Sequence, residues 1–159
     1  MTQELVHGTA VAIGGQGILL TGPSGSGKSD LALRIIDRGG VLISDDIVIV
    51  SGNAGKLSVA VAPKIAGKIE VRGVGICTAP HLSAAPLQLI VGLSNDIIKR
   101  MPEENSTVRM MGVDVPSIEL APFEGSAAIK VEMALKQVLD MVSAAAPLGH
   151  PMTNAGQKL

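Results

Sequence analysis

One segment of the chain combines glycines, a lysine and a serine in an order that suits phosphate binding. Residues 22–29 read Gly-Pro-Ser-Gly-Ser-Gly-Lys-Ser and match the pattern G-x-x-x-x-G-K-[ST] at every defined position. Glycines let such a loop bend until successive backbone N–H groups point at phosphate oxygens. Lys28 can then reach the β- and γ-phosphates, and the Ser29 hydroxyl suits Mg²⁺, which prefers oxygen ligands. The segment therefore predicts a P-loop that binds ATP and Mg²⁺. The predicted nucleotide-binding residues are Gly22, Pro23, Ser24, Gly25, Ser26, Gly27, Lys28 and Ser29.

Two adjacent carboxylates could serve phosphoryl transfer. Asp45 and Asp46 follow the apolar residues 41–43 and come sixteen and seventeen residues after Ser29. In a parallel sheet, the strand after a P-loop helix commonly lies beside the strand before it, so its carboxyl end opens toward the phosphate site. One aspartate of the pair could then take the proton of the phosphoryl acceptor. The alternative interpretation is a turn that merely begins at an Asp-Asp pair.

Three further polar residues lie in strand-like segments. Glu70 and Arg72 alternate with apolar residues ahead of a glycine-rich turn at residues 73–75. Residues two apart on a strand point the same way, so Glu70 could bind a metal ion and Arg72 a phosphate if this strand ends at the same crevice. A solvated salt-bridge face is the alternative. His7 lies in the first predicted strand, where a lone histidine is more often structural than catalytic.

The elements that would position these residues alternate between strands and helices. Apolar runs predict strands at residues 6–13, 17–21, 41–43, 47–50, 57–61, 69–72 and 87–93 and a hairpin over 108–115. Helical spacing of apolar residues predicts helices over 30–38 and 126–142, with one helical turn near 64–68. A strand, loop and helix that open the chain predict an α/β fold. We expect one domain over residues 1–143 and a flexible tail over 144–159.

Composition narrows the class of protein. The 159 residues are 47% hydrophobic and 17% charged, with a net charge of −1, against a usual charged fraction of about 25%. Disorder throughout is excluded, and a near-neutral charge argues against broad nucleic-acid binding. No apolar run is long enough to predict a membrane span, and no signal peptide is apparent. A single cysteine, Cys77, favours a cytoplasmic setting.

Together these segments resemble the catalytic domain of the HPr kinase/phosphorylase family, which acts on a seryl residue of the phosphocarrier protein HPr. His7 precedes the P-loop at the family's spacing, and residues 42–46 resemble the segment that ends in the family's aspartate pair. Residues 69–76, Ile-Glu-Val-Arg-Gly-Val-Gly-Ile, are very similar to the family signature and are the most specific match. Arg100 occupies the place of a further active-site arginine. The resemblance covers residues 6–142.

The resemblance implies a role for each matched residue. Lys28 and its loop would hold ATP, and Ser29 with Glu70 would bind Mg²⁺. Asp45 is implied as the proton acceptor when HPr is phosphorylated and as the proton donor in the reverse phosphorolysis. His7, Lys28 and Arg100 would assist in catalysis, with Asp46 and Arg72 in support.

The resemblance also implies a fold and an assembly. The P-loop-containing sheet would be akin to that of HPr kinase and phosphoenolpyruvate carboxykinase, with a C-terminal helix. HPr would be the partner, and homo-oligomers, as hexamers, are implied.

Two departures from the family's pattern stand out. Many members carry an additional N-terminal domain, so the resemblance implies a form with the catalytic domain only. A basic segment before the last helix, linked in the family to dephosphorylation, corresponds here to residues 122–126, Pro-Phe-Glu-Gly-Ser, which contain no arginine. Glu124 would repel a phosphate there, which weakens the case for the reverse reaction. The alternative functions are a nucleotide-binding regulatory module without turnover and a small-molecule P-loop kinase.

Overall fold

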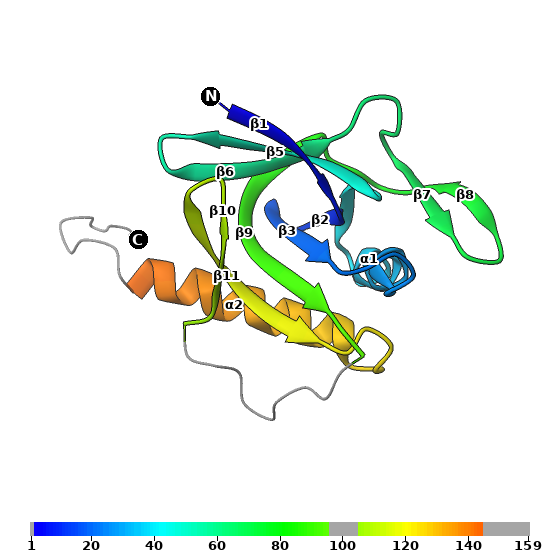
Figure 1. Cartoon of the computed structure of the whole chain (residues 1–159). Helices are drawn as coiled ribbons and strands as arrows, with labels where there is room; N and C mark the ends of the chain where they lie inside the picture. The colour runs from blue at the N-terminus through cyan, green and yellow to red at the C-terminus, as the bar shows by residue number, and fades with distance from the viewer. Residues whose placement is uncertain (1, 96–104, 145–159) are drawn as a thin grey trace, which may run out of the picture.

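The structure, a computed structural model, describes residues 2–95 and 105–144, which form a curled sheet with two helices packed against it (Figure 1). The helices are α1 (Lys28–Asp37) and α2 (Ala127–Ala144). The strands are β1 (Thr2–His7), β2 (Thr9–Ile13), β3 (Gln16–Thr21), β4 (Val41–Ser44), β5 (Ile47–Asn53), β6 (Lys56–Val61), β7 (Lys68–Val71), β8 (Gly75–Thr78), β9 (Ala84–Leu93), β10 (Thr107–Met110) and β11 (Val113–Leu120).

Strand β9 organises the main sheet, whose order is β1-β5-β6-β9-β3-β2-β4. One side of β9 pairs in parallel with β3. Its other side pairs first with β6, antiparallel, and further along with β11, in parallel. Because β9 changes partner partway along its length, the sheet splits and curls, as the bent β9 ribbon shows in Figure 1. The hairpin of β7 and β8 forms a separate two-stranded sheet.

Alternating side chains of the central strands enter two hydrophobic cores. On β3, Ile18 and Leu20 join the core that contains the helix residues, whereas Leu19 joins the core enclosed by the curled sheet. The same alternation holds on β4, where Leu42 packs into the first core and Ile43 into the second. The period of two that defines a strand therefore explains why these short apolar runs are hydrophobic at every position, since both faces are covered.

The predicted strand–loop–helix unit is present. Strand β3 runs into the glycine-rich loop, and α1 begins directly after Gly27, whose φ of 99° lies in the left-handed region that favours glycine. A methyl group at Gly27 would lie 3.0 Å from Cζ of Phe123 and 3.1 Å from Cβ of Pro122. Both the backbone angle and the close contact thus require glycine at the start of this helix. Buried Leu31 and Ile35 hold the helix against the sheet.

The order of the strands differs from the prediction that the strand after the helix lies beside the strand before it. Strand β2 lies between β3 and β4 and is antiparallel to both. It is available because the single strand predicted over residues 6–13 divides at Gly8, where a methyl group would lie 2.8 Å from the backbone oxygen of Leu20. Strands β3 and β4 still run in the same direction, so their carboxyl ends reach the same edge of the sheet.

Several smaller predictions have clear outcomes. The hairpins β5–β6 and β10–β11 and the long helix α2 are present, whereas residues 64–67 form turns that lead into β7 and no helical turn. The predicted tail over residues 144–159 begins at the last residue of α2 and otherwise lies outside the described residues. Neither α1 nor α2, the helices of the described ranges, combines the length and the hydropathy needed to cross a bilayer.

An ion pair joins the two helices and predicts a pH-dependent contribution to stability. The Arg38 guanidinium donates to both carboxylate oxygens of Glu132, with Nε–Oε2 and Nη2–Oε1 distances of 2.7 and 2.9 Å. These hydrogen bonds, helped by the guanidinium charge, lower the pKa of Glu132. A lowered pKa stabilises the fold above the unfolded-state pKa of about 4.3, and this stability is lost as the pH falls through the folded-state pKa.

We therefore expect Glu132→Gln to lower the melting temperature modestly at pH 7 and to have no effect near pH 3, measured by circular dichroism. Asp140→Asn is the matched control, because Asp140 pairs with Lys136 inside one helix and links no two elements. A loss of stability that is equal at both pH values would contradict this role of Glu132.

Candidate active site

A pocket of about 750 Å³ opens beside the glycine-rich loop, at the edge of the sheet where β3 and β4 end. Its walls come from the loop and α1, from the start of β2, from the end of β4 and from the β7–β8 hairpin. The lining residues are Thr9, Ser24, Gly25, Gly27, Lys28, Ser29, Asp30, Leu33, Asp46, Glu70, Val71, Arg72, Gly73, Val74, Gly75 and Phe123. Segments far apart in the sequence therefore meet at one pocket.

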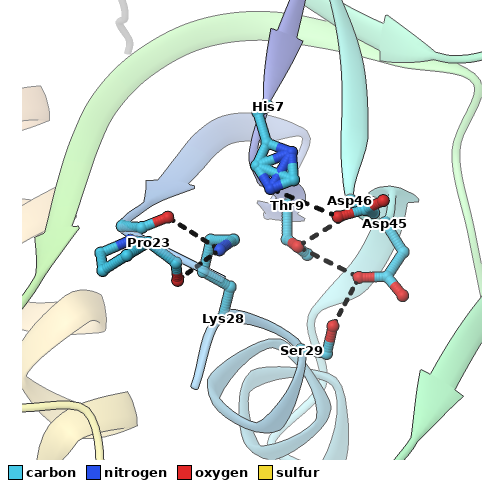
Figure 2. A network of polar contacts seen from close by, with 8 residues as sticks. His7, Thr9, Pro23, Lys28, Ser29, Asp45 and Asp46 are labelled. Carbon is cyan, nitrogen blue, oxygen red and sulfur yellow. Dashed lines mark hydrogen bonds and ion pairs between the residues drawn. The ribbon is translucent and has the colours of Figure 1, made fainter. Parts of the chain in front are cut away.

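The lysine of the glycine-rich loop hydrogen-bonds to the backbone at the start of the same loop. Lys28 is 7% exposed, and its Nζ donates to the backbone oxygens of Gly22 and Pro23 at 2.8 and 3.0 Å (Figure 2). An ammonium group has three protons, so one donor remains for an anion in the pocket. The hydroxyl of Ser26 is buried and finds no hydrogen-bond partner among the described residues. Lys28, which lines the pocket, thus keeps a donor that an anion could engage, which fits a phosphate.

Asp45 is a buried carboxylate that receives three hydrogen bonds. Its Oδ1 accepts from the hydroxyls of Ser29 and Thr9 at 2.7 and 3.1 Å, and its Oδ2 accepts from the backbone N–H of Glu70 at 3.0 Å. Asp45 is only 8% exposed. The three donors come from α1, β2 and β7, so this carboxylate ties the loop helix to the sheet and to the hairpin. Figure 2 shows the contacts of Asp45 with Ser29 and Thr9.

Asp46 has different surroundings. Its side chain is 69% exposed and lines the pocket, and its Oδ1 lies 3.6 Å from Nε2 of His7. Its backbone φ of 71° lies in the left-handed region, which is uncommon for a residue other than glycine and is often found at functional sites. The backbone oxygen of Asp46 accepts from the N–H of Gly8 at 2.9 Å, which fixes this conformation against the β1–β2 junction.

Thr9 is a site residue that the sequence did not reveal. It is fully buried at the start of β2, donates to Asp45 and accepts from the backbone N–H of Asp46 at 3.4 Å. The only signal in the sequence is a hydroxyl at the head of an otherwise apolar strand. Its meaning depends on the insertion of β2 between β3 and β4, which local patterns do not predict.

We expect Thr9→Val, which keeps the shape and removes the hydroxyl, to destabilise the fold by about 1.5–3 kcal/mol, because a hydrogen bond to a buried carboxylate is lost. Chemical denaturation measures this change. Thr107→Val on β10, at an exposed position, is the matched control. Unchanged stability of Thr9→Val would show that the hydroxyl does not hold Asp45.

The remaining predicted residues divide into two groups. Glu70 on β7 and Arg72, directly after this strand of the separate hairpin, both line the pocket, and so does Val71 between them, so the lining does not follow the two-residue spacing. Arg100 lies outside the described residues. Among the described residues, no group of three His, Cys, Asp or Glu side chains could hold a metal ion alone. Mg²⁺ commonly uses one or two protein groups together with substrate phosphates, and Ser29, Asp45 and Glu70 offer the oxygens that it prefers.

An arginine of α1 holds residues 122–126, the segment where the resemblance implied basic side chains. Arg34 donates through Nη1 to the backbone oxygen of Glu124 at 3.1 Å and through Nη2 to the backbone oxygen of Pro122. It also pairs with Asp30. The Glu124 carboxylate pairs with Lys130 at 2.9 Å. The Arg34 cation therefore lies beside this segment, but its donors are used to fix the backbone. These hydrogen bonds also hold Phe123 against the glycine-rich loop.

The fold and the site together define a mixed α/β domain that presents a glycine-rich loop of the phosphate-binding type beside an acidic pocket. The family model for the HPr Serine kinase C-terminal domain matches residues 1–148. The chain belongs to this family, as its sequence segments indicated.

Comparisons with individual proteins agree with this assignment. The chain is 37% identical to HPr kinase/phosphorylase of Lactobacillus johnsonii over 145 residues, which cover 83% of this chain and 46% of the relative. It is 34% identical to HPr kinase/phosphorylase of Bordetella petrii over 147 residues, or 84% of this chain and 48% of the relative. The chain thus spans less than half of the length of these curated relatives.

A solved structure confirms the fold. The structure of the Hpr(Ser) kinase/phosphatase from Coxiella burnetii superimposes with a TM-score of 0.76, at 22% sequence identity. The match covers 88% of this chain and 99% of that chain.

Proposed function

We propose that the chain transfers the γ-phosphoryl group of ATP to a serine of HPr. One observation carries the proposal: a carboxylate that lines the pocket, Asp46, stands next to a glycine-rich loop whose serine is bonded to a second carboxylate, Asp45. Phosphoryl transfer needs this combination, since it depends on holding the phosphates and on a group that accepts the proton of the hydroxyl. The chain's membership of the family and the names of its relatives suggest the substrate class, a serine of HPr.

The chain's own groups divide the work by position. The backbone N–H groups of the loop and the start of α1 would bind the phosphates, and Lys28 would neutralise charge that develops on them. Ser29 and Glu70, which both line the pocket, would hold a magnesium ion, and the ion would offset further phosphate charge when bound. Arg72 lines the same pocket and would face a phosphate oxygen.

The positions of the two aspartates favour Asp46 as the proton acceptor, a role that the sequence comparison gave to Asp45. The oxygens of Asp45 already accept three hydrogen bonds and are buried, so this side chain suits the orientation of Ser29. Asp46 has an exposed carboxylate on the pocket wall, where an incoming hydroxyl can reach it. His7 would orient Asp46 through the contact between them.

The direct test incubates the chain with Mg-ATP and HPr and measures phosphoserine by mass spectrometry. Phosphoserine on HPr is the expected result. Nucleotide binding without any phosphoserine would favour the regulatory module. Phosphorylation of a small molecule in a substrate screen, with HPr left unmodified, would favour the small-molecule kinase. A second reaction with phosphoseryl-HPr and inorganic phosphate tests the reverse phosphorolysis, which the engaged donors of Arg34 do not favour.

The same proposal carries two further expectations. ATP and a phosphocarrier protein as substrates imply a cytoplasmic site of action. A homo-oligomer, as a hexamer, follows from the family resemblance, and sedimentation velocity of the chain measures it directly.

A further inference from the structure

The single aromatic residue of the chain occupies an unusual place. The sequence contains one phenylalanine and neither tyrosine nor tryptophan. Phe123 is 61% exposed, and it lines the pocket beside the glycine-rich loop. An aromatic ring is the largest apolar group available to a core, yet both cores of this domain are built from aliphatic side chains alone. The position of the ring therefore calls for an explanation other than core packing.

The ring lies against the loop itself. A methyl group at Gly27 would lie 3.0 Å from Cζ and 3.2 Å from Cε1 of Phe123, so the edge of the ring covers the backbone of Gly27. Gly27 directly precedes Lys28, the residue expected to contact the phosphates. The ring thus stands next to the place where a bound polyphosphate would lie, with most of its surface left open.

The backbone on both sides of Phe123 is fixed. Arg34 donates to the backbone oxygens of Pro122 and Glu124, the two neighbours of Phe123, and Lys130 holds the Glu124 carboxylate. An aromatic side chain has only two rotatable angles, so little side-chain freedom is lost when a ligand orders the ring. Stacking on such a ring costs little conformational entropy.

The other lining groups show which part of a ligand the ring suits. Asp46, Glu70 and Arg72 are charged and suit the phosphates, the metal ion and the reacting hydroxyl. A flat apolar face suits a flat aromatic partner, and the nucleoside base is the flat part of a nucleotide. Leu33 and Val74 add apolar surface to the same pocket.

We propose that Phe123 is the stacking platform for the nucleoside base of the bound nucleotide. This inference rests on the proposed function, since it requires that a nucleotide occupies the pocket. Every base has a π-face, so the platform gives affinity for nucleotides without selecting strongly among bases.

The test compares two probes that share phosphates but differ in the base. Mg-ATP and Mg-tripolyphosphate are titrated by calorimetry into the wild-type chain, Phe123→Ala and Phe123→Leu. Base–aromatic stacking contributes about 1–3 kcal/mol, so we expect Phe123→Ala to weaken ATP binding roughly tenfold. Tripolyphosphate binding should change less than about twofold. Phe123→Leu keeps an apolar contact with the loop. Like the alanine variant, it should lose affinity for Mg-ATP but keep its affinity for Mg-tripolyphosphate.

A third variant gives a spectroscopic readout. Phe123→Trp creates the sole tryptophan of the chain, because the sequence has none. ATP should quench its fluorescence and bind at least as tightly as to the wild type, whereas tripolyphosphate should leave the emission unchanged.

The outcomes separate the two proposals. If Phe123→Ala loses affinity for Mg-ATP and for Mg-tripolyphosphate equally, the ring supports the loop, and the stacking role is overturned. Unchanged ATP affinity together with a raised KM for HPr would assign it to protein docking, and would also overturn it. If the wild-type chain binds neither probe, the proposed function itself fails. If the wild type binds both probes and no variant changes either affinity, only the stacking role of Phe123 is overturned, and the proposed function stands.

Discussion

Replacing Asp46 by asparagine is expected to reduce phosphoryl transfer to HPr by at least about a hundredfold, while ATP binding and thermal stability stay close to those of the wild type. General base catalysis typically contributes a factor of about 10²–10⁴, and an amide cannot accept the proton of the serine hydroxyl. The side chain of Asp46 is 69% exposed, so its replacement should leave packing intact. Initial rates of phosphoserine formation measure the first effect, and calorimetry with Mg-ATP measures the second.

The variant Asp45→Asn distinguishes the two carboxylates. An asparagine has one acceptor oxygen and one NH₂ group, so in either orientation at least one of the three donors around Asp45 would face an NH₂ group. We expect a loss of stability of about 2 kcal/mol and a raised requirement for Mg²⁺, because Ser29 loses its charged partner. Asp114→Asn, at an exposed ion pair with Arg109, is the matched control for both variants.

The two results together decide the assignment. If Asp46→Asn retains transfer and Asp45→Asn abolishes it without loss of stability, then Asp45 is the proton acceptor, as the sequence comparison implied. The opposite pattern supports the roles proposed from the geometry. If neither substitution changes the rate of transfer, neither aspartate acts as the general base.

The glycine-rich loop could be predicted from the sequence because its physics is local. A strand, a turn that needs positive φ at glycines and a helix follow one another without interruption between residues 16 and 37, and no distant segment is needed to define them. The hairpins β5–β6 and β10–β11 are local in the same sense. The fold class followed from such short-range patterns. A site role for Glu70 and Arg72 followed from the family signature, since their alternation with apolar residues also fits a solvated salt-bridge face.

The parts that escaped prediction depend on contacts between distant residues. The division of the first strand at Gly8 results from its close approach to Leu20, and it lets β2 enter between β3 and β4. Thr9 becomes a site residue only through this insertion. The different surroundings of Asp45 and Asp46 likewise come from donors on α1, β2 and β7, which an Asp-Asp pair in a sequence does not disclose.

The position of Phe123 shows the same limit in another way. The resemblance implied a basic pattern for its segment, so the sequence could indicate only that an arginine is missing there. The structure adds that Arg34, from a helix far away in the sequence, fastens this segment to the loop. The effect of the missing arginine on residues 122–126 therefore has to be judged together with Arg34, a charge that the fold brings to this segment.

Replacing Lys28 by methionine is expected to produce the second large effect, a fall in the rate of transfer to HPr of about 10²–10³-fold. Loss of one preorganised group that stabilises transition-state charge typically costs this much. The methionine keeps most of the length of the side chain but leaves the backbone oxygens of Gly22 and Pro23 without the ammonium donor that now binds them. Affinity for Mg-ATP should fall as well, because both the charge and the shape of the loop change.

Lys136→Met is the matched control for this variant. It makes the same substitution at an exposed ion pair within α2, and we expect it to leave transfer unchanged. Lys28→Arg is a useful companion, since it keeps the charge but replaces a compact ammonium by a planar fork that does not fit between the two carbonyl groups. It should recover only a small part of the activity. Transfer by Lys28→Met within about threefold of the wild-type rate would show that the loop lysine does not act on the phosphates, and the loop would then serve only to hold its ligand through the backbone.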